Sequence, residues 1–396
     1  MISTCSHSIP TLKVISRIIG KIQGKATGPT IVFFAGIHGN EPAGVHALEK
    51  VFRELLADDI KGIVYGITGN LKALEANQRY LEEDLNRIWT KERIKVLKNK
   101  INLNIEEKEQ KELFDILNDI LKSNTGPFYF IDFHTTSSKT LPFITINDAL
   151  INRNFSKLFP VPIVLGIEEY LNGPLLSYIN ELGYVSLGFE AGQHEDKSAI
   201  TNSLSFIYLT LVYAKAINLE KVTDFPIHYN RLKTESHGLL DIFEVVYLHK
   251  IKSNESFSMK VGFKSFQNIK ANTTLALSNG EPIKSKYNAR VFMPLYQSKG
   301  QEGFFLIKHI NPFFLNLSTF LRRFRVDSLL PWLPGVSWEN EDKNALLVNL
   351  KVTQFFAKSL FHLLGYRNKQ LDATHLKLNN RERASKTEMY KNEEWY

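Results

Sequence analysis

Three short segments of the chain carry side chains that can bind a metal ion and activate water. They are HGNE at 38–41, DFH at 132–134 and FEAG at 189–192. Together they supply two histidines and a carboxylate as candidate ligands, and a second carboxylate that can act on water. Histidine nitrogen and carboxylate oxygen suit zinc at ~2.0–2.2 Å, and three protein ligands leave one position of a catalytic site open. This inventory predicts metal-assisted hydrolysis.

The first segment holds two of the candidate ligands, His38 and Glu41, three residues apart across a Gly-Asn turn. At this spacing both side chains can point to one side. A third ligand has to come from elsewhere in the fold, and His134 ends a different predicted strand. Because an HxxE pattern is common by chance, the prediction depends on a fold that brings these segments together.

The elements that must position these residues alternate between apolar, β-branched runs and helical patterns. Buried strands are predicted at 29–37, 61–68, 127–133, 141–146, 161–165 and 183–190, and helices at 42–57, 104–122 and 196–219. This alternation predicts an α/β fold with a mostly parallel central sheet flanked by helices. In such sheets ligands bind at the carboxyl ends of the strands, and all three chemical segments lie where predicted strands end.

The character of the sequence changes near residue 225, which divides the chain into three predicted parts. Residues 1–225 form the catalytic domain. Residues 226–312 contain short alternating segments separated by Gly, Asn and Ser, which predict a smaller β-rich domain covering the cleft. Residues 313–396 are predicted to be a helical, partly disordered tail, with an apolar helix at 349–365 and a polar, charged end.

Four motifs in the order HGNE, DLNR, DFHTT and EAG resemble the succinylglutamate desuccinylase/aspartoacylase family, a branch of the zinc carboxypeptidase superfamily. The resemblance covers about residues 15–310, so the tail extends beyond the family's usual end. It implies a zinc carboxypeptidase-like fold. It also implies one Zn2+ per chain, bound by His38, Glu41 and His134.

The same resemblance implies roles for a second set of residues. Glu190 resembles the general base, which takes a proton from zinc-bound water and passes it to the leaving amine; the alternative is a carboxylate that caps the following helix. Arg79 resembles the arginine that stabilises the oxyanion. Asn86 and Arg87 resemble the pair that grips a substrate carboxylate. Apart from the resemblance, we expect Asp84 to orient their loop.

Other polar residues near the motifs carry weaker signals. Thr135 either lines the pocket and binds substrate or satisfies loop backbone groups. Tyr296, in the loop MPLYQSKGQEG, resembles a tyrosine that family members bring into the cleft. Asp132 either braces a zinc-bound histidine or forms an unrelated buried hydrogen bond. His194 and Glu195 are expected to face solvent.

Two departures limit the resemblance. Aspartoacylases bind substrate with a further arginine about ten residues before the catalytic glutamate, and residues 176–183 contain none, so N-acetylaspartate is not the expected substrate. The tail segment FFLNLSTFLRRFRVDSLLPWLPGVSW mixes aromatic residues with Arg322, Arg323 and Arg325. We expect this segment to pack on the catalytic domain rather than on a membrane surface.

Composition narrows the remaining choices. The formal net charge of +8 favours anionic ligands, but the charge is not clustered as nucleic-acid binding requires. The single cysteine, Cys5, excludes an internal disulfide and fits a reducing cytoplasm, which is the expected location. The N-terminus is too polar for a secretory signal. Whether the chain forms a homo-oligomer is left open.

We therefore predict a zinc-dependent amidohydrolase that removes the acyl group from a small, carboxylate-bearing N-acyl amino acid or similar linear amide. The first alternative is a zinc metallocarboxypeptidase acting on peptides. The second is a non-catalytic anion-binding protein, against which the complete set of ligands and base argues. Sequence does not distinguish zinc from other divalent ions, because His and Glu ligands accept several.

Overall fold

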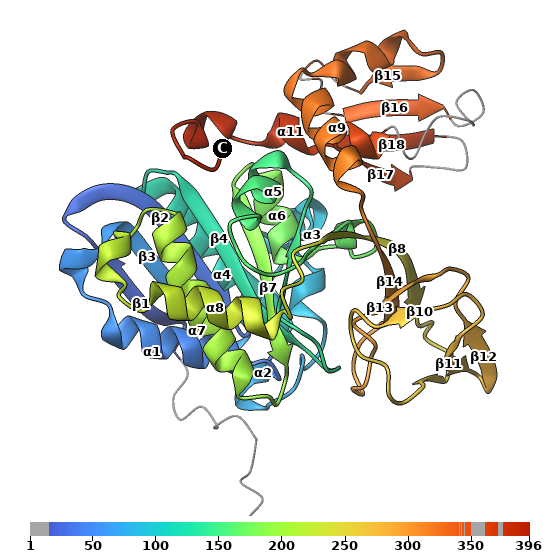
Figure 1. Cartoon of the computed structure of the whole chain (residues 1–396), viewed down its shortest axis with the longest axis horizontal. Coiled ribbons are helices and arrows are strands. Elements are labelled where there is room, and N and C mark those ends of the chain that lie inside the picture. The colour runs from blue at the N-terminus through green and yellow to red at the C-terminus, as the bar shows by residue number, and fades with distance from the viewer. Residues whose placement is uncertain (1–15, 340, 342, 344, 350–360, 371–374) are drawn as a thin grey trace, which may run out of the picture.

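The computed structural model describes residues 16–339, 341, 343, 345–349, 361–370 and 375–396 (Figure 1). An 11-stranded mixed sheet has the order β1-β3-β2-β4-β7-β5-β6-β8-β14-β13-β10. Its strands are β1 (Ile18–Gln23), β2 (Ala26–Ala35), β3 (Lys61–Thr68), β4 (Phe128–Thr136), β5 (Phe143–Ile146), β6 (Ile163–Leu165), β7 (Val185–Gln193), β8 (Ile242–Lys250), β10 (Asn268–Ile269), β13 (Ala289–Phe292) and β14 (Glu302–His309).

Helices cover both faces of this sheet, as Figure 1 shows for α1, α7 and α8 in front of the strands. They are α1 (Ala43–Glu54), α2 (Leu71–Glu75), α3 (Lys91–Leu97), α4 (Ile105–Ser123), α5 (Leu150–Ser156), α6 (Leu175–Glu181), α7 (Ser198–Tyr213) and α8 (Phe225–Glu235). Helix α4 illustrates the local causes: its apolar residues recur at helical spacing, and Asn104 and Glu107 close a capping box at its start. The predicted α/β fold with a mostly parallel centre is confirmed.

Alternation along β4 separates the two cores and fixes which side chains can reach the site. Tyr129, Ile131 and Phe133 enter the core that contains α1 and α7, whereas Phe128 and Phe130 enter the core that contains α4 and α6. Because successive side chains of a strand point to opposite faces, Asp132 and His134 share the second face with Phe130. The parallel partner β7 follows the same alternation, so Glu190 lies on that face too.

The β-rich segment after α8 continues the central sheet. Strand β8 pairs in parallel with β6, and β14, β13 and β10 add antiparallel strands beyond it. A separate three-stranded sheet contains β9 (Phe257–Met259), β11 (Thr274–Ser278) and β12 (Glu281–Lys284). The expected boundary near residue 225 therefore does not interrupt the sheet.

The tail differs from the expected helical segment. After α9 (Pro312–Arg323) it forms a four-stranded antiparallel sheet, drawn in orange in Figure 1, and then α11. These elements are β15 (Val336–Trp338), β16 (Ala345–Asn349), β17 (Tyr366–Gln370), β18 (His375–Asn380) and α11 (Arg381–Ala384). Most of the helix predicted at 349–365 lies outside the described residues. The strand at 345–349 was missed because it directly precedes the apolar run that suggested a helix.

The expected polar, disordered end of the tail is also corrected. The Tyr390 hydroxyl donates a hydrogen bond to the backbone oxygen of Phe128 at 2.6 Å and accepts one from the Val185 amide at 3.0 Å. It thereby ties the starts of β4 and β7 together, and Trp395 packs nearby against Phe155. Two aromatic residues spaced through a polar run form no periodic pattern, so sequence alone does not reveal this packing. In the described part of the chain, no helix has the length and apolarity to span a bilayer.

Candidate metal centre

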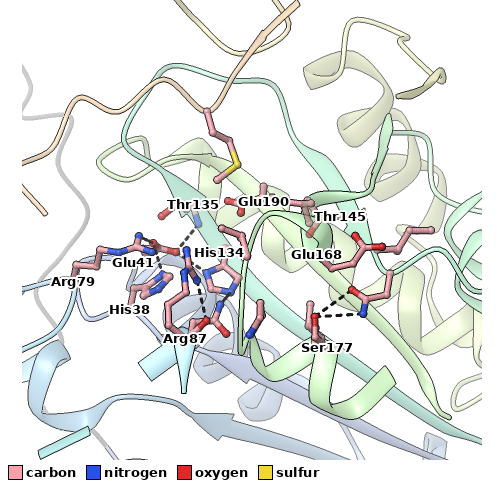
Figure 2. Close-up of a pocket in the computed structure, with 18 residues that line it drawn as sticks. His38, Glu41, Arg79, Arg87, His134, Thr135, Thr145, Glu168, Ser177 and Glu190 are labelled. Atoms are coloured by element: carbon pink, nitrogen blue, oxygen red, sulfur yellow. Dashed lines mark hydrogen bonds and ion pairs between the residues drawn. The ribbon is translucent and has the colours of Figure 1, made fainter. Parts of the chain in front are cut away.

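The three candidate ligands meet at the carboxyl ends of β2 and β4. His38 and Glu41 lie in the loop between β2 and α1, and His134 lies on β4. Nδ1 of His38 is 2.9 Å from Oε1 of Glu41, and Nδ1 of His134 is 3.0 Å from Oε2 of the same carboxylate. One ligand atom from each residue lies within 4.8 Å of the others, and Figure 2 shows the three side chains converging.

The HGNE loop reaches this position because glycine allows close packing at its turn. A Cβ at Gly39 would lie 2.0 Å from the backbone carbonyl carbon of Ala73 in α2. The Gly39 amide also donates a hydrogen bond to the Arg79 carbonyl at 3.1 Å. Only a residue without a side chain fits here, and the loop is thereby held against the segment that carries Arg79.

A second carboxylate holds the other nitrogen of each histidine. Nε2 of His38 is 3.0 Å from Oδ1 of Asp84, and Nε2 of His134 is 2.9 Å from Oδ2 of Asp132. Such partners fix the orientation of a ligating imidazole and raise its basicity. Of the two roles considered for Asp132, the structure therefore favours the bracing one, and Asp84 gains a direct contact with a candidate ligand.

The charges in this group reinforce one another. Burial opposes the shift, but His38 and His134 together hold the pKa of Glu41 well below its usual range. Burial alone would lower the pKa of His134, but Asp132 and Glu41 raise it well above its usual value. The cluster places carboxylates around two imidazoles, an arrangement in which a cation can replace the protons of its ligands.

Glu190 lies beside this group on β7. It is the register partner of His134 across the parallel β4–β7 pair, and only 7% of its surface is exposed. Its Oε2 atom is buried and has no hydrogen-bond partner among the described residues. Burial raises the pKa of Glu190 to about 8. A buried carboxylate with one free oxygen next to a ligand set is placed to exchange a proton with a molecule in the cavity.

The arginine-bearing loop predicted at 79–87 also reaches the site. Arg79 donates to Oδ2 of Asp84 from Nε at 3.1 Å and from Nη2 at 2.9 Å, and its Nη1 is 3.6 Å from Oε1 of Glu41. Asn86 and Arg87 follow in the 3-10 turn Leu85–Arg87, which Asp84 caps through the Asn86 amide. All three predicted residues line the same cavity as the candidate ligands.

Asn86 and Arg87 already have partners inside the protein. Oδ1 of Asn86 accepts a hydrogen bond from the Leu175 amide at 2.9 Å. Arg87 pairs with Glu302 of β14, whose Oε1 is 3.1 Å from Nη2 of the arginine. A substrate carboxylate would have to share or replace the contact with Glu302.

The weaker predictions have mixed outcomes. Thr135 lines the cavity, and its amide donates to Oε2 of Glu41 at 3.0 Å. Tyr296 does not line it: its hydroxyl donates to the Lys260 carbonyl at 2.8 Å within the β-rich segment. His194, expected to face solvent, instead contacts the Thr135 hydroxyl at 2.8 Å, and burial lowers its pKa. Glu195 is exposed, as expected.

Several cavity residues carried no usable signal in the sequence. A second cavity adjoins the first and contains Gln297 and Glu302 from the β-rich segment. Both belong to the polar loop from which only Tyr296 was selected. On the opposite side, Glu168 lines the first cavity and forms an ion pair with Arg381 of α11. Glu302 follows Arg87 by 215 residues, and Arg381 follows Glu168 by 213. No sequence pattern links residues that lie so far apart in the chain.

Comparisons with known proteins agree with this arrangement. Residues 27–204 match the family model of the succinylglutamate desuccinylase/aspartoacylase catalytic domain. A succinylglutamate desuccinylase from Pseudomonas aeruginosa is 36% identical over 70 residues, 17% of this chain and 21% of the relative. A probable aspartoacylase from Acaryochloris marina is 28% identical over 205 residues, 48% of this chain and 64% of the relative. The chain thus spans about a fifth of the length of the desuccinylase and just under two thirds of the length of the probable aspartoacylase.

Solved structures show the same fold. The crystal structure of a succinylglutamate desuccinylase/aspartoacylase from Rhodobacter sphaeroides has a TM-score of 0.57 at 13% identity, covering 74% of this chain and 88% of that one. The motifs that suggested the family all lie within the matched residues 27–204 and meet at one site. Residues 27–204 therefore resemble the catalytic domain of the succinylglutamate desuccinylase/aspartoacylase family.

Proposed function

We propose that this protein is a zinc-dependent hydrolase that removes the acyl group from a small N-acyl amino acid or a similar carboxylate-bearing amide. One observation carries the proposal. The ligand atoms of His38, Glu41 and His134 converge within 4.8 Å, and the free carboxylate oxygen of Glu190 lies beside them. The names of the relatives, a succinylglutamate desuccinylase and a probable aspartoacylase, support a deacylation.

The donor set fits zinc. Two imidazoles and one carboxylate are its preferred ligands in hydrolases, and each imidazole here is braced by a further carboxylate, Asp84 or Asp132. Zinc bound by His38, Glu41 and His134 would supply a Lewis acid that polarises the amide carbonyl and makes water more acidic. Three protein ligands leave room for exchangeable ones.

The remaining chemistry belongs to side chains of the chain itself. A positive charge at the ligand set would favour the ionised form of Glu190, which would take a proton from the attacking water and deliver it to the amine nitrogen as the amide bond breaks. Arg79 is held by Asp84, with Nη1 close to the ligand set, and would stabilise the negative charge that develops on the carbonyl oxygen. This division of roles needs no nucleophilic side chain and no covalent intermediate.

The shape of the site supports a small substrate. The 167–177 segment on one side and the 293–302 loop on the other both line the cavities around the candidate ligands. The second wall is braced by the Arg87–Glu302 ion pair. Arg87 and Asn86 would bind the substrate carboxylate, with Glu302 competing for the guanidinium.

Metal analysis of the purified protein, combined with a substrate panel, tests the proposal. We expect one zinc per chain, loss of activity with a chelator and recovery on adding zinc. We also expect hydrolysis of at least one member of a panel of N-acyl amino acids. Cleavage restricted to the C-terminal residues of peptides would favour the metallocarboxypeptidase instead. Absence of metal binding together with absence of activity after zinc addition would favour a non-catalytic anion-binding protein.

A further inference from the structure

Helix α9 exposes its aromatic face to solvent. Phe313 and Phe320 of α9, and Phe324 at its C-cap, lie at helical spacing along one side and are 65%, 57% and 66% exposed. The opposite side, which packs on the protein, carries Leu315, Ser318 and Arg322. A surface helix of a globular protein normally buries its apolar stripe and exposes its charges. Here the orientation is reversed.

The reversed orientation is fixed by the buried arginine. Nη2 of Arg322 is 2.6 Å from Oδ2 of Asp148, and its Nη1 is 3.2 Å from Oε1 of Glu382. Its Nε also donates to the Leu363 carbonyl at 3.1 Å. Rotating α9 to bury the phenylalanines would strip this charged side chain of its partners, which is strongly unfavourable. The aromatic face is therefore a stable feature of the surface.

The turn after α9 adds to the same kind of surface. The 3-10 helix η5 (Val326–Trp332) packs against α9 and exposes Leu329 and Trp332, the latter by 83%. Within α9 the rings of Phe320 and Phe324 lie 4.6 Å apart, so they form one continuous aromatic patch. Exposed apolar clusters of this kind mark interaction sites.

The exposed charges of α9 and of the turn that follows it, Arg323 and Arg325, are positive, whereas Asp241, which pairs with His309, is an exposed carboxylate outside these elements. Between Gly303 and Trp338 the exposed charged residues are Lys308, Arg323 and Arg325, apart from a half-exposed His309. The one carboxylate of this stretch, Asp327, is buried against Arg383. A partner that covers α9 and η5 would thus meet exposed phenylalanine and tryptophan side chains together with Arg323 and Arg325.

Although the sequence favours packing of this segment on the catalytic domain over a membrane contact, only one side of α9 is buried, and we propose that the exposed side of α9, with η5, docks on the surface of an anionic lipid bilayer. Phe and Trp can enter the boundary between headgroups and acyl chains, while Arg323 and Arg325 contact anionic headgroups. Each arginine near such a surface increases partitioning by about fivefold. A second copy of the chain is a poorer partner, because a two-fold contact would bring the arginines toward their own equivalents without an exposed carboxylate in this stretch to compensate them.

Vesicle flotation with the full chain tests this docking. The vesicles contain either phosphatidylcholine alone or equal parts of phosphatidylcholine and phosphatidylserine. We expect the wild type to float with the anionic vesicles and to be released by high salt. The double variant Phe320→Ser/Phe324→Ser should lose at least about tenfold in binding, as should Arg323→Gln/Arg325→Gln.

Matched controls separate docking from general surface effects. Ile227→Ser and Val261→Ser replace apolar residues that are 64% and 89% exposed elsewhere, and Lys108→Gln removes an exposed charge on α4. These variants should float like the wild type. Circular dichroism should show every variant folded, since all substituted side chains face solvent.

Three results would overturn the proposal. The first is a wild type that does not float with anionic vesicles. The second is a Phe320→Ser/Phe324→Ser variant that floats as well as the wild type. The third is a concentration-dependent dimer in analytical ultracentrifugation that the same double substitution abolishes, which would assign the patch to a second copy. Membrane docking does not require catalysis, so none of these results depends on the proposed hydrolase activity.

Discussion

Arg87 and Glu302 form an ion pair between the loop beside the candidate metal centre and the first residue of strand β14. Oε1 of Glu302 lies 3.1 Å from Nη2 of Arg87 and 3.2 Å from its Nε. Both residues line the second cavity. The Glu302 carboxylate therefore binds the Arg87 guanidinium, which we propose as the binding group for the substrate carboxylate. This competition makes the ion pair a determinant of substrate affinity.

Removing the charge of Glu302 should strengthen substrate binding. In Glu302→Gln the Arg87 guanidinium loses its internal carboxylate, so we expect KM for a carboxylate-bearing substrate to fall about fivefold, equivalent to about 1 kcal/mol for a partly exposed pair. The value of kcat should change little. Steady-state kinetics measures both, and Glu281→Gln, at an exposed position of β12, is the matched control. A higher KM in Glu302→Gln would mean that Glu302 supports binding instead of competing with it.

Asp132 should tune metal affinity without being a ligand. Its Oδ2 holds Nε2 of His134 at 2.9 Å, so Asp132→Asn weakens the bracing of that imidazole. We expect zinc affinity to fall about 10- to 100-fold. Competition with a chromogenic chelator measures the affinity, and Asp119→Asn, exposed on α4, is the control. Unchanged affinity in Asp132→Asn would remove this residue from the metal centre.

Tyr390 should stabilise the start of the two strands that carry His134 and Glu190. Tyr390→Phe removes the acceptor of the buried Val185 amide, at a cost of about 1–3 kcal/mol in the free energy of unfolding. Urea denaturation followed by circular dichroism measures the loss. Tyr287→Phe, at a position 39% exposed, should stay within about 0.5 kcal/mol of the wild type. Equal stability of both variants would contradict the bridging role.

The sequence was sufficient for the elements that have a clear hydrophobic period. The strand predicted at 61–68 is β3, Lys61–Thr68, and the helix predicted at 104–122 is α4, Ile105–Ser123. The candidate ligands followed from the same patterns, because parallel strands bring their carboxyl ends together regardless of the chain length between them. Local periodicity and one topological rule thus account for the core of the site.

The missed features depend on contacts between distant residues. Glu302 reaches Arg87 only because β14 joins the sheet beside β8. A single glutamate at the start of a strand forms no repeating sequence pattern from which this contact could be predicted. Tyr296 was predicted in the cleft, yet its hydroxyl bonds the Lys260 carbonyl. The outward face of α9 depends on distant contacts as well: its amphipathic pattern predicts burial, and the pairing of Arg322 with Asp148, 174 residues earlier, and with Glu382 reverses it.

The central claim is that Glu190 transfers protons in a zinc-dependent hydrolysis. The most direct test is the rate at which zinc-loaded Glu190→Gln hydrolyses the best substrate of the wild type, with the zinc content of both proteins measured. We predict that the variant keeps its zinc and loses about 10²- to 10⁴-fold in kcat. A variant that retains zinc and hydrolyses this substrate as fast as the wild type would contradict the account.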